Sequence, residues 1–170
     1  SINTALRPIN FKLPSIHDVL EKVRSKKFVS CADISDCFFS FRLSPASQEK
    51  LTAYLPDLEC LGPEYYLPKT IKFTRLPQGI KIAVAVVAAF KELFKATLYK
   101  RLAKLGNKSN IEAFVDDMCL CSDSLEEHIE AIIEFFKLSH DLCLKYPPKK
   151  IRLFCKNEFQ VLGFEIEKGT

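Results

Sequence analysis

The 170-residue sequence has no apolar run near the roughly 18 residues that a membrane-spanning helix needs. Its first residues, SINTALRPIN, also lack the pattern of a secretory signal peptide. Internal repeats and Gly/Ser linkers are missing, and a composition of 48% hydrophobic and 27% charged residues excludes disordered, collagenous and coiled-coil proteins. A chain of this length buries roughly 70% of its unfolded surface. We therefore expect one globular domain, or one domain with part of another, and no membrane association.

Seven cysteines show no framework spacing, and we expect reduced thiols in an intracellular compartment. Cys119 and Cys121 share one face of a predicted strand and would make half of a zinc site, but no second pair or suitably spaced histidine accompanies them. Small core residues are the favoured interpretation. The three histidines, His17, His128 and His140, have no Cys or carboxylate partners in the pattern and are expected at the surface.

Charge is unevenly distributed, although its net value is only +4. Residues 1–30 carry six basic and two acidic side chains, residues 81–108 seven and one, and residues 137–170 seven and four, whereas residues 109–136 carry eight acids and no Lys or Arg. This pattern suits a protein that grips polyphosphate and holds cations. Exposed helix faces of different sign explain it as well, and on charge alone that explanation is favoured. The same two alternatives, a phosphate-binding stripe or a solvated helix face, stay open for Lys91, Lys95, Lys100, Arg101 and Lys104.

Hydrophobic periodicity and turn residues predict an α+β fold, an antiparallel sheet with helices packed on one face. Strands are expected at residues 27–33, 51–55, 71–76 and 159–166, with short ones around 143 and 153, and a loop at 57–69. Helices are expected at 14–23, from Ser44-Pro45 onward, at 79–105, and at 125–136 after a capping box at Ser124 and Glu127. Residues 112–121 predict a β-hairpin with Asp116-Asp117 at its turn.

Three carboxylates stand at the ends of predicted strands: Asp33, Asp116 and Asp117. Clustered carboxylates raise each other's pKa and resist ionisation, and a divalent cation removes that cost. Hard oxygen ligands with several waters are what Mg²⁺ prefers. Turn chemistry explains an Asp-Asp pair equally simply and is the favoured explanation for that pair taken alone. Because adjacent strand residues face opposite sides, only one of the two can point fully inward, and we favour Asp116.

Five motifs follow one another along nearly the whole chain: DISDCFFSFRL from Asp33, RLPQGIK from Arg75, FVDD from Phe114, the pair Lys149-Lys150, and LGFEI from Leu162. Their order and approximate spacing resemble those of reverse transcriptases, notably retroviral enzymes of the gammaretrovirus and foamy-virus kind and those of LTR retrotransposons. A lone Asp-Asp would be weak evidence, but five ordered motifs are specific. The resemblance implies a polymerase palm, an antiparallel sheet backed by helices, with part of the fingers, over residues 1–170.

The resemblance also implies a metal site and a proton donor. Asp33 and Asp116, with Asp117 as a lesser participant, would be catalytic and would hold two Mg²⁺ ions, with Mn²⁺ as the alternative. Lys150 would protonate the pyrophosphate. Lys149 is the alternative, because the spacing from Lys150 to Leu162-Gly163 is one residue longer than usual.

Nucleotide and primer contacts are implied in the same way. Phe38 would lie under the incoming sugar and exclude a 2′-hydroxyl, while the Asp36 amide and the Phe39 ring would support the triphosphate and the pocket wall. The loop at Gln78 and Gly79 would touch the nucleotide and the template. The primer grip would comprise Leu162, Gly163 and Phe164.

Two departures from the family pattern stand out. After Leu-Pro-Gln-Gly the family usually has an aromatic residue, Lys, Asn or Gly, and then Ser-Pro, where this chain has Ile80-Lys81-Ile82-Ala83-Val84. The change removes a hydroxyl near the template strand and alters the start of the long helix. Ile2-Asn3 falls where a Leu-Asn pair closes the fingers, so the fingertip segment, thumb, connection and RNase H parts are expected to be absent from residues 1–170.

The function implied is template-directed transfer of deoxynucleotides to a primer 3′-hydroxyl, an RNA-directed DNA polymerase activity. Its partners would be an RNA or DNA template with primer, deoxynucleoside triphosphates, and the thumb, RNase H and integrase of a polyprotein. Its location would be the host cytoplasm or the core of a virion or virus-like particle. A non-catalytic remnant that binds nucleic acid or protein is the alternative, and the change at Ile82-Ala83-Val84 favours it. An RNA-dependent RNA polymerase is a weaker alternative, since Phe38 would obstruct a ribose.

Overall fold

The computed structural model describes residues 2–7, 9, 11, 14–54, 70–114, 117–155, 158–161 and 164–167. The chain divides into two compact units, one formed by Ser1–Pro8 with Asp36–Ala83 and the other by Ile9–Ser35 with Val84–Thr170. Among the helices of the described ranges, none is both long enough and apolar enough to cross a membrane. The loop expected at 57–69 lies outside the described residues.

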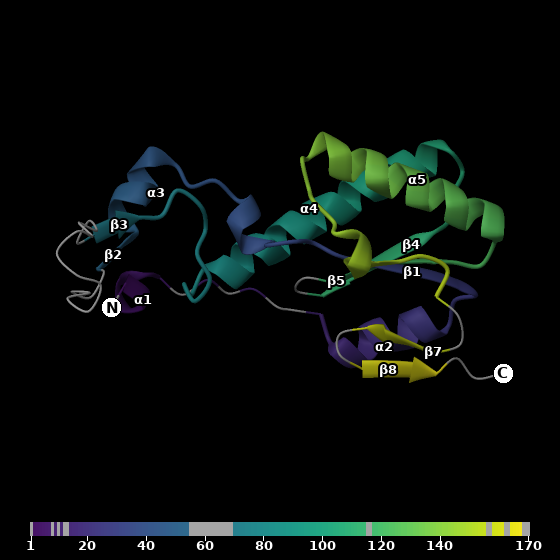
Figure 1. Ribbon diagram of the computed structural model, residues 1–170. Coiled ribbons are helices and arrows are strands. Elements are labelled where there is room, and N and C mark those ends of the chain that lie inside the picture. Colours follow the sequence, from purple (N-terminus) through teal and green to yellow (C-terminus); the bar gives the residue numbers. More distant parts are fainter. Residues whose placement is uncertain are drawn as a thin grey trace. The chain divides into compact units, whose positions relative to one another are not determined.

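The larger unit is built on a four-stranded antiparallel sheet with the strand order β4-β5-β1-β6 (Figure 1). Its strands are β1 (Phe28–Asp33), β4 (Asn110–Phe114), β5 (Asp117–Ser122) and β6 (Ile151–Arg152). The strand that ends at Asp33 is internal, because β1 pairs with β5 on one side and with β6 on the other. Residues 29–32 are buried at four successive positions, which is typical of a strand covered on both faces.

Helices cover both faces of this sheet (Figure 1). α4 (Ala83–Lys104) and α5 (Leu125–Asp141) lie over one face, where Phe94 of α4 and Phe135 of α5 make an edge-to-face contact with ring centroids 5.4 Å apart. α2 (Ile16–Arg24) lies on the other face. There it completes a buried cluster of Val19, Val23, Val29, Cys31, Cys119 and Cys121. The predicted α+β class is confirmed, and α2 adds a cover on the second face.

The two long helices begin and end largely where their capping residues indicate. The Ser124 hydroxyl accepts a hydrogen bond from the Glu127 amide at the start of α5, as the capping box predicts, whereas the Glu127 carboxylate accepts from the Lys108 amide instead of returning to Ser124. α4 begins at Ala83, four residues later than expected, because Gly79 adopts a positive φ of 86° in the preceding turn. Gly106, with a φ of 71°, follows its end, a left-handed conformation that glycine adopts without strain.

The C-terminal segment forms strands where strand structure was expected at 159–166, and it excludes another strand. β7 (Glu158–Val161) and β8 (Phe164–Glu167) form an antiparallel hairpin that begins one residue earlier and ends one residue later than expected, and β8 contacts α2. The strand expected around Cys143 is wrong. Cys143 has a φ of 55° and its amide donates to the His140 carbonyl, so this residue closes the turn after α5.

The smaller unit is held by a compact apolar cluster. Its elements are α1 (Ile2–Ala5), the 3₁₀ turn η1 (Phe38–Ser40), α3 (Pro45–Lys50), and the paired strands β2 (Thr52–Tyr54) and β3 (Thr70–Lys72). The strand expected to reach residue 76 ends at Lys72, and Arg75 instead forms an isolated bridge with Arg42. The cluster comprises buried Leu76, Ile80 and Ala83 with partly buried Leu6, Phe38, Phe41, Leu43 and Leu51.

Six cysteines lie among the described residues, and all are free thiols. Cys31, Cys119 and Cys121 are buried in the cluster under α2, so the core interpretation of Cys119 and Cys121 is the one the structure shows. The Cys31 and Cys119 sulfurs lie 2.9 Å apart on adjacent strands. The hydrogen bond with Cys119 and burial hold the pKa of the Cys31 thiol well above its usual range. Such a thiol resists conversion to the reactive thiolate.

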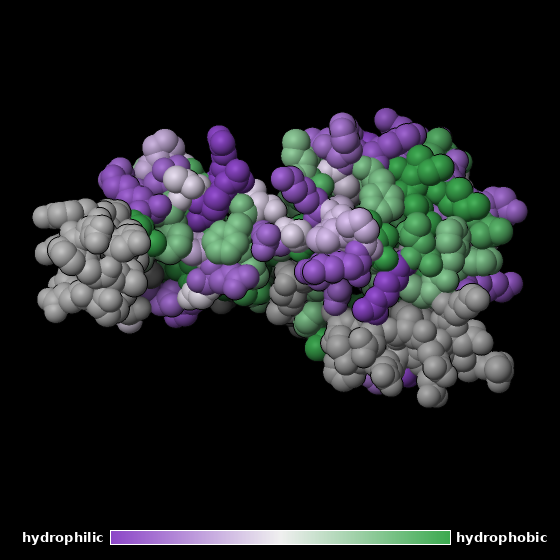
Figure 2. Space-filling view, viewed as in Figure 1, coloured by the Kyte–Doolittle hydropathy of each residue, from purple (hydrophilic) through white to green (hydrophobic). Residues whose placement is uncertain are grey.

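One face of α5 carries exposed apolar side chains. Leu125, Ile129 and Ile133 repeat at four-residue spacing and are each between 43% and 48% exposed. Figure 2 shows hydrophobic surface over this part of the larger unit. The opposite face of the helix holds His128, Ala131, Phe135 and Leu138, which are buried. α5 therefore presents apolar side chains on two sides, of which one faces its own sheet.

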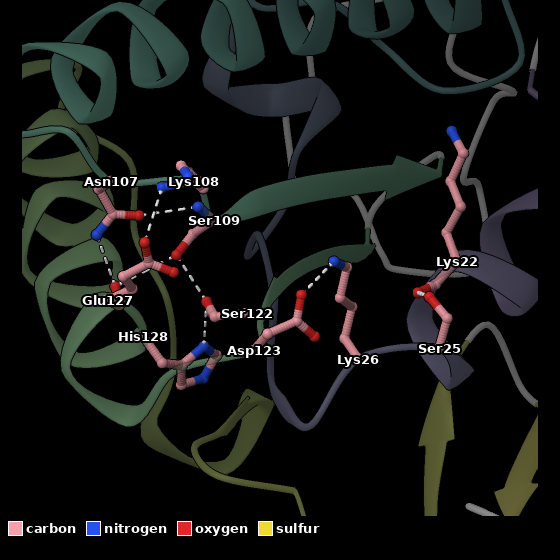
Figure 3. A network of polar contacts seen from close by, with 10 residues as sticks. All are labelled: Lys22, Ser25, Lys26, Asn107, Lys108, Ser109, Ser122, Asp123, Glu127 and His128. Atoms are coloured by element: carbon pink, nitrogen blue, oxygen red, sulfur yellow. Dashed lines mark hydrogen bonds and ion pairs between the residues drawn. The ribbon is translucent and has the colours of Figure 1, made fainter.

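A buried polar network joins α5 to the sheet (Figure 3). His128 is fully buried, and its two ring nitrogens lie 2.8 Å from the Ser30 hydroxyl on β1 and 2.9 Å from the Ser122 hydroxyl on β5. Ser122 in turn contacts the Ser109 hydroxyl at 2.7 Å. The expectation that His128 lies at the surface is wrong, because two serines on neighbouring strands satisfy both ring nitrogens inside the core.

Replacement of His128 by leucine should lower the free energy of unfolding, because both serine hydroxyls lose their bond to the imidazole. Each buried polar group left unsatisfied costs about 1–3 kcal/mol, and we expect the low end, because Ser122 keeps its contact with Ser109 and Ser30 still accepts from the Phe154 amide. Urea unfolding of the two forms measures the loss. His140→Leu is the matched control, since the His140 side chain is 92% exposed. Equal effects of the two substitutions would show that the network contributes nothing.

Candidate metal and nucleotide site

The sheet of the larger unit places two carboxylates directly opposite each other. In the antiparallel pairing of β1 with β5, Asp33 is the register partner of Asp117. Side chains of directly opposed residues on neighbouring strands point to the same face, with Cβ atoms about 4.5–5.5 Å apart. Like charges in this arrangement repel, so the sheet concentrates negative charge at the end where β1 stops and β5 starts.

The two oxygens of Asp33 have different surroundings. Oδ2 accepts a hydrogen bond from Lys150 Nζ at 2.7 Å, and the two side chains are 28% and 39% exposed respectively. Oδ1 is buried and has no hydrogen-bond partner among the residues the structure describes. A buried carboxylate oxygen without a partner is costly, and a bound cation is one way to satisfy it.

These groups fit the divalent cation that the resemblance implies. Mg²⁺ is commonly bound through one or two carboxylates together with waters and substrate phosphates, so a complete protein cage is not required. No cluster of three or more Asp, Glu, His or Cys side chains able to hold a metal occurs within the described ranges, which leave out Asp116. Asp33 and Asp117 are therefore the ligands that the described residues offer, and the orphaned Oδ1 is the observation in their favour.

A short segment beside β1 places Lys150 next to Asp33. The 3₁₀ turn η3 (Pro148–Lys150) leads directly into β6, which pairs with β1 at Ala32 and Cys31. Lys150 therefore stands next to the end of β1, whereas Lys149 is exposed. Of the two lysines considered, Lys150 is the one whose amine contacts Asp33.

A second lysine approaches the hairpin from α4. Lys91 is only 3% exposed, and its Nζ donates to the Asp117 carbonyl at 3.2 Å. The proposed basic stripe of the long helix is therefore not continuous, since its first member is buried. Lys95 and Arg101 also form ion pairs, with Glu92 and Asp141 respectively. Burial of Lys91 was not predicted from the sequence, although the apolar residues around it in the first half of the helix indicate it.

The nucleotide-contact candidates lie in the smaller unit. Asp36 has a φ of 47°, which turns the chain into η1. Phe38 is half-buried against the Leu76, Ile80 and Ala83 cluster, whereas Phe39 is 44% exposed. Gln78 and Gly79 are exposed in the turn before α4.

Asn3 clamps that turn in place. Its side-chain amide donates to the Gly79 carbonyl at 3.0 Å and accepts from the Lys81 amide at 2.8 Å. These two bonds connect α1 to a segment more than 75 residues away and fix the backbone on both sides of Ile80. In the sequence, Asn3 was recognised only as part of the pair that matches the Leu-Asn of the family. Its contact with the turn was not expected.

Several expected site residues lie outside the described part of the chain. Asp116, Leu162 and Gly163 are among them, and Phe164 is described only as the first backbone position of β8. Their roles stay predictions. At Ile82-Ala83-Val84, where the sequence departs from the family pattern, the structure shows the role of Ala83. This residue begins α4, is 1% exposed and belongs to the apolar cluster of the smaller unit.

The family model described as "Reverse transcriptase (RNA-dependent DNA polymerase)" matches residues 2–166 of this sequence. The chain belongs to the reverse transcriptase family. Its similarity to the Gag-Pol polyprotein of gibbon ape leukemia virus is 27% identity over 99% of the chain, and to the Pol polyprotein of the Drosophila melanogaster transposon gypsy 25% over 99%. The Pro-Pol polyprotein of simian foamy virus type 3 is 27% identical over 88%. The chain spans 9%, 14% and 11% of these three polyproteins.

Solved structures of a foamy viral protease-reverse transcriptase share the fold. The form in complex with double-stranded DNA has a TM-score of 0.76 at 21% identity, over 98% of this chain and 26% of the other. The form in complex with an RNA/DNA hybrid has a TM-score of 0.72 at 22% identity, over 98% and 20%. The expected resemblance to retroviral, foamy-virus and retrotransposon reverse transcriptases is confirmed, and so is the expected fold.

Lys150→Met should destabilise the chain in EDTA by about 1 kcal/mol, because a half-buried carboxylate loses its charged hydrogen-bond donor. Chemical denaturation measures the change, and Lys149→Met controls for the loss of one positive charge in the same turn. The effect should disappear in an Asp33→Asn background. If Lys149→Met destabilises as much as Lys150→Met, the ion pair with Asp33 is not the cause.

Proposed function

We propose that the chain is the palm, with part of the fingers, of an enzyme that transfers deoxynucleotides to the 3′-hydroxyl of a primer on an RNA or DNA template. The observation that carries this proposal is the opposition of Asp33 and Asp117 at the end of an internal strand pair, with Asp33 Oδ1 buried and without a hydrogen-bond partner in the described part of the chain. Opposed carboxylates of this kind cost folding free energy, which a metal-dependent function would explain. Family membership supports the same activity.

Asp33 and Asp117, with Asp116 as the further candidate, would hold two divalent cations. When bound, Mg²⁺ ions would lower the pKa of the primer hydroxyl and neutralise charge on the leaving pyrophosphate. Lys150 lies within reach of Asp33 and would give a proton to that pyrophosphate. The remaining residues would position the reactants, which is the larger part of catalysis in phosphoryl transfer.

The proposed nucleotide contacts come from residues of the smaller unit. The Asp36 amide and the Phe39 ring would support the triphosphate and the pocket wall, and Phe38 would lie under the sugar. Asn3 holds the turn that carries Gln78 and Gly79, so this turn would meet the nucleotide and template with a fixed backbone. Leu162, Gly163 and Phe164 would grip the primer. Double-stranded DNA and RNA/DNA hybrid in the foamy viral structures support nucleic acid as the partner.

Asp33→Asn should abolish single-nucleotide incorporation while the fold persists, because the change removes a ligand charge but almost no volume. The assay uses primer–template, Mg²⁺ and the chain joined to a following thumb segment, with melting temperature as the measure of folding. Glu49→Gln, an exposed acid paired with Lys72, is the control for loss of one negative charge. A variant that still extends the primer would refute the assignment, and an inactive parent chain would favour the non-catalytic remnant.

Phe38→Val should admit ribonucleotides far better, with use of deoxynucleotides reduced only modestly, because the ring no longer meets a 2′-hydroxyl. The unmade hydrogen bond alone is worth roughly 1–3 kcal/mol of discrimination. Incorporation of matched ribo- and deoxynucleotides gives the ratio directly. Phe41→Val is the control, since Phe41 packs on the same apolar cluster. Equal loss of discrimination in both variants would assign the effect to packing.

A further inference from the structure

Lys91 is a charged side chain in a place that an apolar one would fill at lower cost. It is 3% exposed, and it lines a hollow of about 290 Å³ whose other walls are apolar apart from Glu92. Taking an ammonium group out of water costs several kcal/mol unless its surroundings compensate. Methionine has a similar length and would avoid this desolvation cost, but it could not donate a hydrogen bond. A buried lysine at this position therefore calls for a function.

The position of its amine indicates that function. Lys91 Nζ donates to the carbonyl of Asp117, the first residue of β5, at 3.2 Å. The same hollow is lined by Ala113 of β4, and side chains alternate between the two faces of the sheet. Glu112, the neighbour of Ala113, contacts Lys22 of α2. The alternation along β4 and β5 therefore puts Lys91 on the face that α4 covers and the Asp117 side chain, with that of Asp33, on the face of α2.

Lys91 accordingly acts on the site without being a ligand. Its hydrogen bond holds the backbone at the residue where the hairpin enters β5. Its charge lies on the face of the sheet opposite to the one that carries the Asp33 and Asp117 side chains. Among the described residues, Lys150 and Lys91 bring two positive charges to the strand ends that carry the Asp33 and Asp117 carboxylates. These two carboxylates therefore have compensating charge within the protein before any cation binds.

We propose that Lys91 is a positioning residue that holds the Asp117 backbone and balances the metal-binding carboxylates, at the expense of affinity for divalent cations. This inference rests on the proposed cation site at Asp33 and Asp117. A positive charge close to a divalent ion repels it, and this repulsion persists in the protein interior, where screening is weak. The lysine therefore stabilises the metal-free hairpin and raises the concentration of cation needed to fill the site.

Two substitutions separate the charge of Lys91 from its hydrogen bond. Lys91→Gln removes the charge and keeps a donor of nearly the same reach, whereas Lys91→Met removes both. Lys95→Gln is the matched control, because Lys95 lies one turn further along α4 and pairs with Glu92 at 3.6 Å. The measurement is the melting temperature of the 170-residue chain, first in EDTA and then over a range of Mg²⁺ concentrations.

Both Lys91 variants should reach their half-maximal Mg²⁺-induced rise in melting temperature at a concentration about three- to tenfold lower than the parent chain. Lys91→Met should also melt lower in EDTA than Lys91→Gln, because it loses the bond to the Asp117 carbonyl. Lys95→Gln should leave the Mg²⁺ concentration dependence unchanged. A purely structural lysine would change the melting temperature in EDTA and leave that dependence unaltered, which would overturn the proposal.

A metal-free arm distinguishes failure of this inference from failure of the proposed site. In EDTA, Lys91→Gln should lower the melting temperature less in an Asp117→Asn background than in the parent chain, because one of the carboxylates it balances is gone. If no form of the chain responds to Mg²⁺, the cation site itself is wrong, and this coupling alone decides the role of Lys91. Additive effects of the two substitutions would exclude charge balance by Lys91.

Discussion

Electrostatic repulsion between Asp33 and Asp117 is the constraint on which the candidate site depends. The pairing of β1 with β5 places the two carboxylates opposite each other at a sheet end. Both strands are internal, so they cannot slide past each other to move the carboxylates apart. Such a pair lowers stability unless positive charge compensates it. Lys150 contacts the Asp33 carboxylate from the side of β6, and in our proposal Lys91, which binds the Asp117 carbonyl, adds a second positive charge from the side of α4.

The rest of the larger unit makes that arrangement rigid. β1 is internal, and helices cover its two faces, so Asp33 ends a strand whose preceding four residues are all buried. The His128 network joins α5 to the middle strands β1 and β5 through two serines. Because α5 is anchored to the same two strands that carry the carboxylates, their register cannot shift without breaking buried hydrogen bonds. In the smaller unit, Asn3 gives comparable rigidity, since its two hydrogen bonds fix the turn of Gln78 and Gly79.

Much of the fold was predictable because local signals and tertiary packing agree. The capping residue Ser124, the period of α5, and the strand that ends at Asp33 were placed correctly. Errors arose where a non-glycine residue adopts a positive φ, as Cys143 does, since nothing in its side chain announces that conformation. His128 was misplaced for a different reason. A histidine becomes a core residue only when partners from distant strands satisfy its ring, and Ser30 lies 98 residues away.

The sequence by itself determined the family and the fold class of this protein: the order of its motifs, the clustering of acids in residues 109–136, and the α+β pattern that places Asp33 and Asp117 at strand ends. Only the tertiary structure decided that Asp33 faces Asp117, that Lys150 contacts Asp33, and that Lys91 is buried behind the hairpin. The reason is physical. Periodicity and capping act over a few residues, whereas strand register and the burial of a charge depend on contacts between segments 26 to 117 residues apart.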